Sequence, residues 1–140
     1  MTATTTPINI EYRDGILIPL ALAASAIVLQ GTFAVVGTNG YALASAAVGG
    51  EDQVCIGIWE NDAENDGANG AALGLVRRNK QFLVSNSATD PVTQAELGSQ
   101  IYIQDNQTVA KTDGAGTRSV AGRFMGFDTE YTTHVWVEIT

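Results

Sequence analysis

Residues 120–139 read VAGRFMGFDTEYTTHVWVEI, and this stretch decides the fold class. Two apolar runs, 120–127 and 134–139, flank a short polar connection, which is the pattern of two β-strands joined by a turn. In the second run, every other residue is a branched aliphatic: Val135, Val137 and Ile139. Because successive side chains of a strand point to opposite faces, these three residues are predicted to form a core face.

Similar short segments precede this pair along the chain, with turn residues between them. The expected strands cover two segments within 16–29, then 31–36, 41–44, 54–59, 72–77, 81–86, 100–104 and 108–111. Asn39-Gly40 predicts a tight turn, and residues 78–80 predict a hairpin between the strands at 72–77 and 81–86.

Residues 93–96 (TQAE) fit a capping box that Gly98 ends, which predicts one short helical turn. No internal repeat is visible. Short strands at regular spacing predict an all-β fold, a small single-domain β-barrel or sandwich.

The first fourteen residues differ from the rest. Residues 1–7 are rich in threonine, and Ile8, Ile10 and Tyr12 then alternate with polar residues without an obvious partner strand. We predict an extended N-terminal arm over residues 1–14 and a compact β domain over 15–140. A plain disordered terminus remains the alternative for the arm.

Charge and hydropathy exclude several classes of partner. Fifteen acidic and seven basic residues give a net charge of −8, which disfavours binding to a phosphate backbone. The basic residues near 77–80 and 118–123 are interpreted as solvated turn charges. The apolar run 16–29 is shorter than the roughly 20 residues of a membrane span and contains Pro19, and no positively charged leader precedes it.

Residues for chemistry are scarce. A catalytic triad or a zinc site needs more than the single histidine, His134, and the single cysteine, Cys55, which is interpreted as a buried small hydrophobe. The acidic loop at 60–67 resembles the start of a calcium loop, but Leu73 stands where a bidentate glutamate is required. We therefore predict a non-enzymatic protein with no catalytic, metal or cofactor site, and a solvated loop at 60–67.

Several segments in order carry a family resemblance. They are NSATDPVTQAELG (86–98), IYI (101–103), DNQTVAKT (105–112), GTRSVAG (116–122) and VWV (135–137). This series resembles the capsid decoration, or cement, proteins of tailed bacteriophages, most clearly over 76–139 and more weakly over 17–64. The segment before Ile16 departs from the pattern.

The resemblance implies a structural virion protein on the outer face of an icosahedral head, which it stabilises. Its implied partners are the major capsid protein and further copies of itself in a homotrimer, with neither nucleic acid nor membrane. Within that interpretation, the arm is expected to contact the capsid, through Pro7, Ile8, Ile10 and Tyr12.

Two alternatives remain open. One is a β-sandwich module that binds carbohydrate or a cell surface, with Trp59, Trp136 and Tyr131 as a stacking platform, although Trp59 fits a core position better. The other is a different phage virion protein, such as a component of the tail tube.

Overall fold

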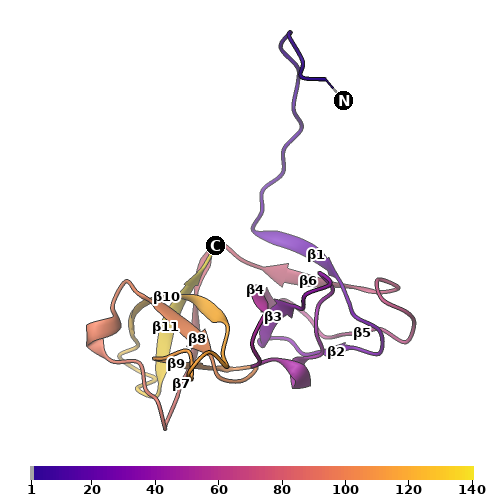
Figure 1. The fold of residues 1–140 in the computed structure, drawn as a ribbon. Coiled ribbons are helices and arrows are strands. Elements are labelled where there is room, and N and C mark those ends of the chain that lie inside the picture. The colour runs from indigo at the N-terminus through magenta and orange to yellow at the C-terminus, as the bar shows by residue number, and fades with distance from the viewer. Residues whose placement is uncertain (1) are drawn as a thin grey trace.

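The computed structural model describes residues 2–140, and nearly all of its regular structure is short β-strand (Figure 1). The strands are β1 (Leu17–Ala21), β2 (Ile27–Val28), β3 (Phe33–Val36), β4 (Val54–Trp59), β5 (Ala63–Glu64), β6 (Leu73–Arg77), β7 (Lys80–Asn86), β8 (Gln100–Ile103), β9 (Thr108–Ala110), β10 (Val120–Phe127) and β11 (His134–Ile139). The helical segments are two 3-10 turns, η1 (Ser45–Ala47) and η2 (Gln94–Glu96). The sequence predicted η2 but not η1. Within residues 2–140, no helix is long and apolar enough to cross a membrane. The predicted all-β class is confirmed.

Strands β7 to β11 close into a barrel in the order β10-β11-β7-β9-β8, and we call residues 80–139 the C-terminal barrel. Its interior holds branched aliphatic side chains around the fully buried Phe124. Val135 and Val137 have no exposed surface, and Ile139 is 2% exposed. The core face predicted for the last strand is therefore confirmed.

The remaining strands form a second unit, which we call the N-terminal ring (residues 17–77). Its four-stranded sheet has the order β1-β6-β4-β3, and bridges from Ala42 to Val36 and to Leu22 connect the two outer strands. Trp59, 1% exposed, fills the centre of this ring. A separate antiparallel pair of β2 and β5 lies beside it.

The ring and the barrel have the same strand connections. β1, β3, β4 and β6 pair with one another as β7, β8, β10 and β11 do, and Ala42 takes the place of β9. In both units the contact between the first strand and the β9 position is parallel, whereas the other pairs are antiparallel. The chain therefore contains an internal structural repeat.

The equivalence extends to single residues. A Cβ on Gly57 would lie 2.3 Å from the backbone oxygen of Arg77, and one on Gly122 would lie 2.2 Å from that of Glu138. Just before these two glycines, the register of β4 with β3 and of β10 with β8 shifts by a bulge. The same close approach and the same irregularity thus occur at the same place in both units.

A turn is repeated as well. Gly31 and Gly98 have φ angles of +82° and +83°, which favour glycine. Their N–H groups donate to the backbone oxygens of Trp59 (3.0 Å) and Phe124 (2.8 Å), which are themselves equivalent.

This repeat is a feature of the structure that is not visible in the sequence. Equivalent strand segments read LIPLAL (17–22) and QFLVSN (81–86), or LGLVRR (73–78) and HVWVEI (134–139). Among these positions only Val76 and Val137 are identical. A barrel constrains which side chains point inward and where the backbone approaches closely, and both constraints admit many residues.

Two local predictions also need correction. β6 and β7 do not form a hairpin, because β6 pairs with β1 and β4 while β7 pairs with β11 and β9. The short connection between them, with Asn79 at φ +58°, carries the chain from the ring to the barrel. The strand predicted at 41–44 is reduced to the bridges at Ala42.

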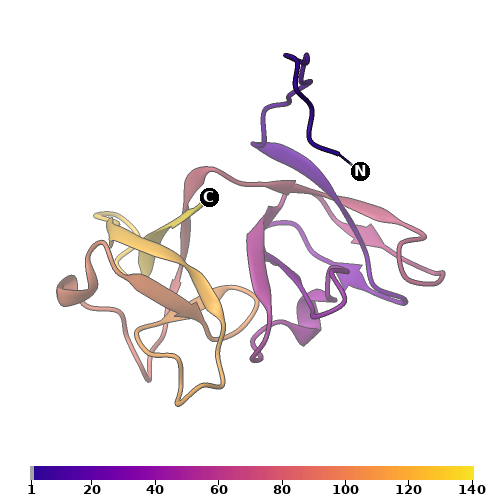
Figure 2. The same ribbon diagram turned by 45° about the horizontal axis from the view of Figure 1, so that its top comes forward.

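The ring packs against the barrel (Figure 2). Phe33, Val35 and Val48 belong to the same buried cluster as the barrel interior. Polar contacts join the two units as well: the Phe33 N–H donates to the Asn106 backbone oxygen (3.0 Å), and the Gln53 N–H donates to Ser119 Oγ (2.9 Å).

Candidate functional site

The N-terminal arm carries the contact residues predicted from the sequence. Residues 2–14 contain no strand or helix and are exposed throughout, and they project away from both units (Figure 1). Ile8, Ile10 and Tyr12 are 62%, 71% and 95% exposed, and Pro7 is exposed beside them. Three apolar side chains of the arm thus face solvent.

A groove lies where the ring meets the barrel. Its volume is about 610 Å³, within the range of ligand-binding clefts. One wall is the start of β4 and the other is formed by β10 and the end of β11. The lining residues are Gln53, Val54, Cys55, Gln100, Arg118, Ser119, Val120, Ala121, Gly122, Arg123, Glu138, Ile139 and Thr140.

Both walls contain strand segments with an open edge. The ladder between β4 and β6 holds only Ile58–Arg77 and Trp59–Val76, so residues 54–57 have no described strand beside them on that edge. The ladder between β10 and β11 begins at Arg123–Glu138, so residues 120–122 also have no described strand beside them on that edge. The open segments occupy equivalent places in the repeat and both border the groove.

The groove is held at one end by Ser119. Its hydroxyl accepts a hydrogen bond from the Gln53 N–H and donates to the Gly50 backbone oxygen, both at 2.9 Å. At the other end, the N–H of Asn79 donates to the backbone oxygen of Ile139 at 2.7 Å. The first contacts hold the segment before β4 against the barrel, and the second holds the β6–β7 connection against the end of β11.

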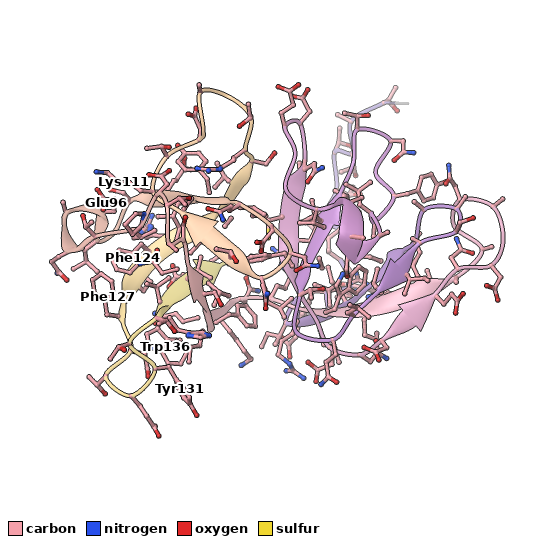
Figure 3. The ribbon with its side chains drawn as sticks, turned by 90° about the horizontal axis from the view of Figure 1, so that it is seen from below. Glu96, Lys111, Phe124, Phe127, Tyr131 and Trp136 are labelled. Carbon is pink, nitrogen blue, oxygen red and sulfur yellow. The ribbon has the colours of Figure 1, made fainter. Side chains whose placement is uncertain are left out.

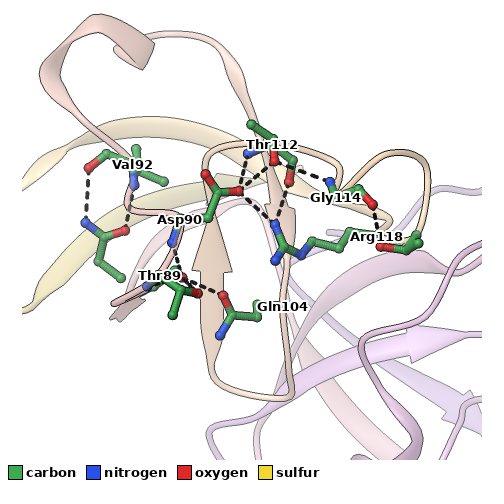
Figure 4. Close-up of polar contacts among 10 residues, drawn as sticks. Thr89, Asp90, Val92, Gln104, Thr112, Gly114 and Arg118 are labelled. Carbon is green, nitrogen blue, oxygen red and sulfur yellow. Dashed lines mark hydrogen bonds and ion pairs between the residues drawn. The ribbon is translucent and has the colours of Figure 1, made fainter.

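The charged groups of the groove differ in their partners. Arg118 Nη1 donates to Asp90 Oδ2 (2.8 Å) and to the Thr112 backbone oxygen (3.0 Å), as part of the network that holds the 112–118 loop (Figure 4). Hydrogen bonds from Thr112, followed by Arg118, hold the pKa of Asp90 below its ordinary value. Arg123 and Glu138, in contrast, form no ion pair with any residue in 2–140.

The interpretation of the basic residues as solvated turn charges is therefore wrong at two positions. Arg118 makes the contacts above, and Arg77 forms a two-point ion pair with Glu60 (2.7 and 2.8 Å). The Arg77 hydrogen bonds lower the pKa of the Glu60 carboxyl.

An aromatic surface lies on the outside of the C-terminal barrel. Phe127 and Tyr131 are 42% and 56% exposed, and Trp136 is half-buried. Figure 3 labels all three side chains on the same side of the barrel. Phe127 packs edge-on against Phe124 at 5.2 Å between ring centroids. Trp59 is buried in the ring, so it cannot belong to a stacking platform with Tyr131 and Trp136.

Cys55 contributes to core packing, and the acidic loop at 60–67 contributes to hydrogen bonding within the N-terminal ring. Burial raises the pKa of the Cys55 thiol to about 12, so the reactive thiolate is scarce at neutral pH. The loop at 60–67, predicted to be solvated, has one buried residue, Asn65, which is 1% exposed. Its Nδ2 donates to the backbone oxygens of Leu22, Ala23 and Ala68 (3.1, 2.9 and 3.0 Å). Within residues 2–140, no three His, Cys, Asp or Glu side chains are grouped as metal ligands.

The groove is the feature that the sequence did not reveal. Its walls, around Val54 and Val120, lie about one repeat apart in the chain and meet only because the ring packs on the barrel. The sequence offered one signal for the groove, the glycines Gly57 and Gly122, because each stands at the end of a strand segment with an open edge. Comparisons of the chain with protein families, with curated proteins and with solved structures find no match.

Proposed function

We propose that the protein is a structural virion protein of a tailed bacteriophage, a decoration or cement protein that binds the outer face of the icosahedral head and stabilises it. Its partners are the major capsid protein and other copies of itself in a homotrimer. The observation that carries this proposal is the exposed arm, with Ile8, Ile10 and Tyr12 facing solvent. Such a segment buries its apolar side chains and pairs its backbone only by meeting another protein.

Two further features support the proposal. The net charge of −8 suits the outside of a head better than its DNA-filled interior. The polar and apolar contacts between the ring and the barrel make the two units a stiff body from which the arm extends. The arm, through Pro7, Ile8, Ile10 and Tyr12, then reaches a neighbouring protein of the shell.

The test is binding to purified heads that lack the protein. The full chain is mixed with heads, the heads are sedimented, and bound protein is measured at increasing salt concentration. We expect saturable binding of the full chain and much weaker binding of residues 15–140, whose folded state is checked by circular dichroism. Equal binding of both chains would remove the arm from the account, and no binding of either would reject the proposed function.

A carbohydrate- or surface-binding module is the second candidate, and the aromatic surface favours it. Exposed aromatic rings such as those of Phe127 and Tyr131 can stack on sugar rings. A glycan array probed with the full chain tests this candidate, with Tyr131→Ala as the loss-of-binding variant and Tyr12→Ala, in the arm, as its matched control. Binding that Tyr131→Ala alone abolishes would favour this function over the first.

A further inference from the structure

We propose that the inter-unit groove is the acceptor for the N-terminal arm of a second copy of this chain, which adds there as a β-strand. The inference rests on the proposed function only in assuming that copies lie next to one another. It identifies the neighbour that the arm reaches, and it is tested on the free protein.

The first argument is the state of the groove walls. Residues 54–57 of β4 and 120–122 of β10 have no described strand on their groove-facing edges. An open strand edge pairs readily with an extended peptide, through its backbone N–H and C=O groups. These two segments are thus open strand edges that lie together at the contact between the two units.

The arm is a suitable peptide. Its apolar residues alternate with polar ones over residues 8–13, as one half-buried strand requires. Val54 and Val120, on the two walls, are 57% and 38% exposed. Ile8, Ile10 and Tyr12 on one face of an added strand would cover apolar surface of this kind, and would lose their own exposure.

The position of the arm favours exchange between copies. Its root lies near one end of the groove, because a Cβ on Gly15 would be 3.8 Å from Asn79 Nδ2, and Asn79 bonds to the groove residue Ile139. From this root the arm points away from its own body (Figure 1). Extended, it reaches about 40 Å, far enough to enter an adjacent copy. Repeated head-to-tail exchange closes a ring when the rotation per copy allows it.

The first experiment measures self-association of full-length variants by sedimentation velocity over a range of concentrations. Val54→Arg in the groove is compared with Leu73→Arg, which is 62% exposed at the start of β6 and does not line the groove. Ile10→Glu in the arm is compared with Asn9→Glu, the same charge on the opposite face. We expect the wild type to associate, Val54→Arg and Ile10→Glu to weaken association at least about tenfold, and both controls to stay within about threefold.

The second experiment locates the contact. Chains carrying Ile10→Cys and chains carrying Val54→Cys bear different tags, and they are mixed under mild oxidation. We expect a disulfide between the two kinds of chain, and none when Leu73→Cys replaces Val54→Cys. Wild-type chains, which retain Cys55, serve as the background control. Thermal melting confirms that each variant is folded.

Three results would overturn the inference: a wild-type chain that is monomeric throughout the concentration range, equal losses for Val54→Arg and Leu73→Arg, or no disulfide between the Ile10→Cys and Val54→Cys chains beyond the wild-type background. The two proposals fail separately. Arm exchange without binding to heads rejects the cement function alone, and binding to heads without arm exchange rejects this inference alone.

Discussion

The N-terminal ring and the C-terminal barrel have one plan of strand pairing and two different interiors. In the ring, Trp59 packs against Gly74, whose Cβ would lie 2.4 Å from the indole ring. At the equivalent positions the barrel has Phe124 and Val135. A large and a very small residue in one unit thus replace two of intermediate size in the other.

The same exchange occurs elsewhere in the two interiors. Ala34 and Ala42 of the ring are equivalent to Ile101 and Val109 of the barrel, and all four are fully buried. The ring surrounds one tryptophan with alanine and glycine, whereas the barrel distributes its volume over branched aliphatic residues. Total volume and backbone register, rather than particular side chains, therefore specify this fold.

The largest effect is expected where the repeat leaves no room for a side chain. Gly57→Val and Gly122→Val each place a Cβ within about 2.3 Å of a backbone oxygen. Each should destabilise the protein by about 3 kcal/mol or more, measured by urea unfolding. Gly15→Ala, whose Cβ would meet nothing closer than 3.8 Å, is the control and should be nearly neutral. A small effect at either strand glycine would break the proposed equivalence.

The second prediction converts one interior into the other. Gly74→Val alone drives a side chain into Trp59 and should cost about 2–3 kcal/mol. Adding Trp59→Phe recreates the Phe124–Val135 combination and should recover at least about 1 kcal/mol of that loss. Strictly additive free energies of unfolding in the double-mutant cycle would contradict the volume-exchange account.

The third prediction compares the identical pair. Val76 and Val137 are both fully buried at equivalent positions. Val137→Ala should cost about 1–3 kcal/mol through lost burial and a cavity, and Val76→Ala should cost a similar amount. If either variant changes the unfolding free energy by only a few tenths of a kcal/mol, that unit does not share the packing of its counterpart.

The smallest effect concerns the ion pair that holds the 112–118 loop of the barrel. The pKa of Asp90 is lowered in the folded protein, so its contribution to stability is present above the ordinary carboxyl pKa and is lost as pH falls below about 4. Asp90→Asn should cost about 1 kcal/mol at pH 7 and less at acid pH. An equal cost at pH 7 and pH 3 would show that the carboxylate charge is not involved.

Strand positions were largely predictable from the sequence, and the partners of the strands were not. Alternation placed Val135 and Val137 correctly, because burial on one face imposes a period of two. The connection at 78–80 predicted a hairpin, since turn chemistry is local and does not report that Asn79 leads from the ring into the barrel. The repeat stayed hidden because Gly74 and Val135 serve the same position with different side chains.

The candidate site divides in the same way. The arm was predictable from the alternation of Ile8, Ile10 and Tyr12 with polar residues, because this pattern is local and can be recognised without the tertiary structure. The groove was not visible, because Val54 and Val120 come together only through the packing of one unit on the other. Trp59, a candidate for a surface platform, is buried because its unit closes around it.

The most direct test of the account is a cryo-electron microscopy map of phage heads that lack the protein, recorded before and after the full chain is added. The account predicts new density on the outer face of the shell, large enough for the two packed units of each copy, and an accompanying rise in the temperature at which the heads rupture. Heads that show no added density, or density confined to the tail, would contradict it.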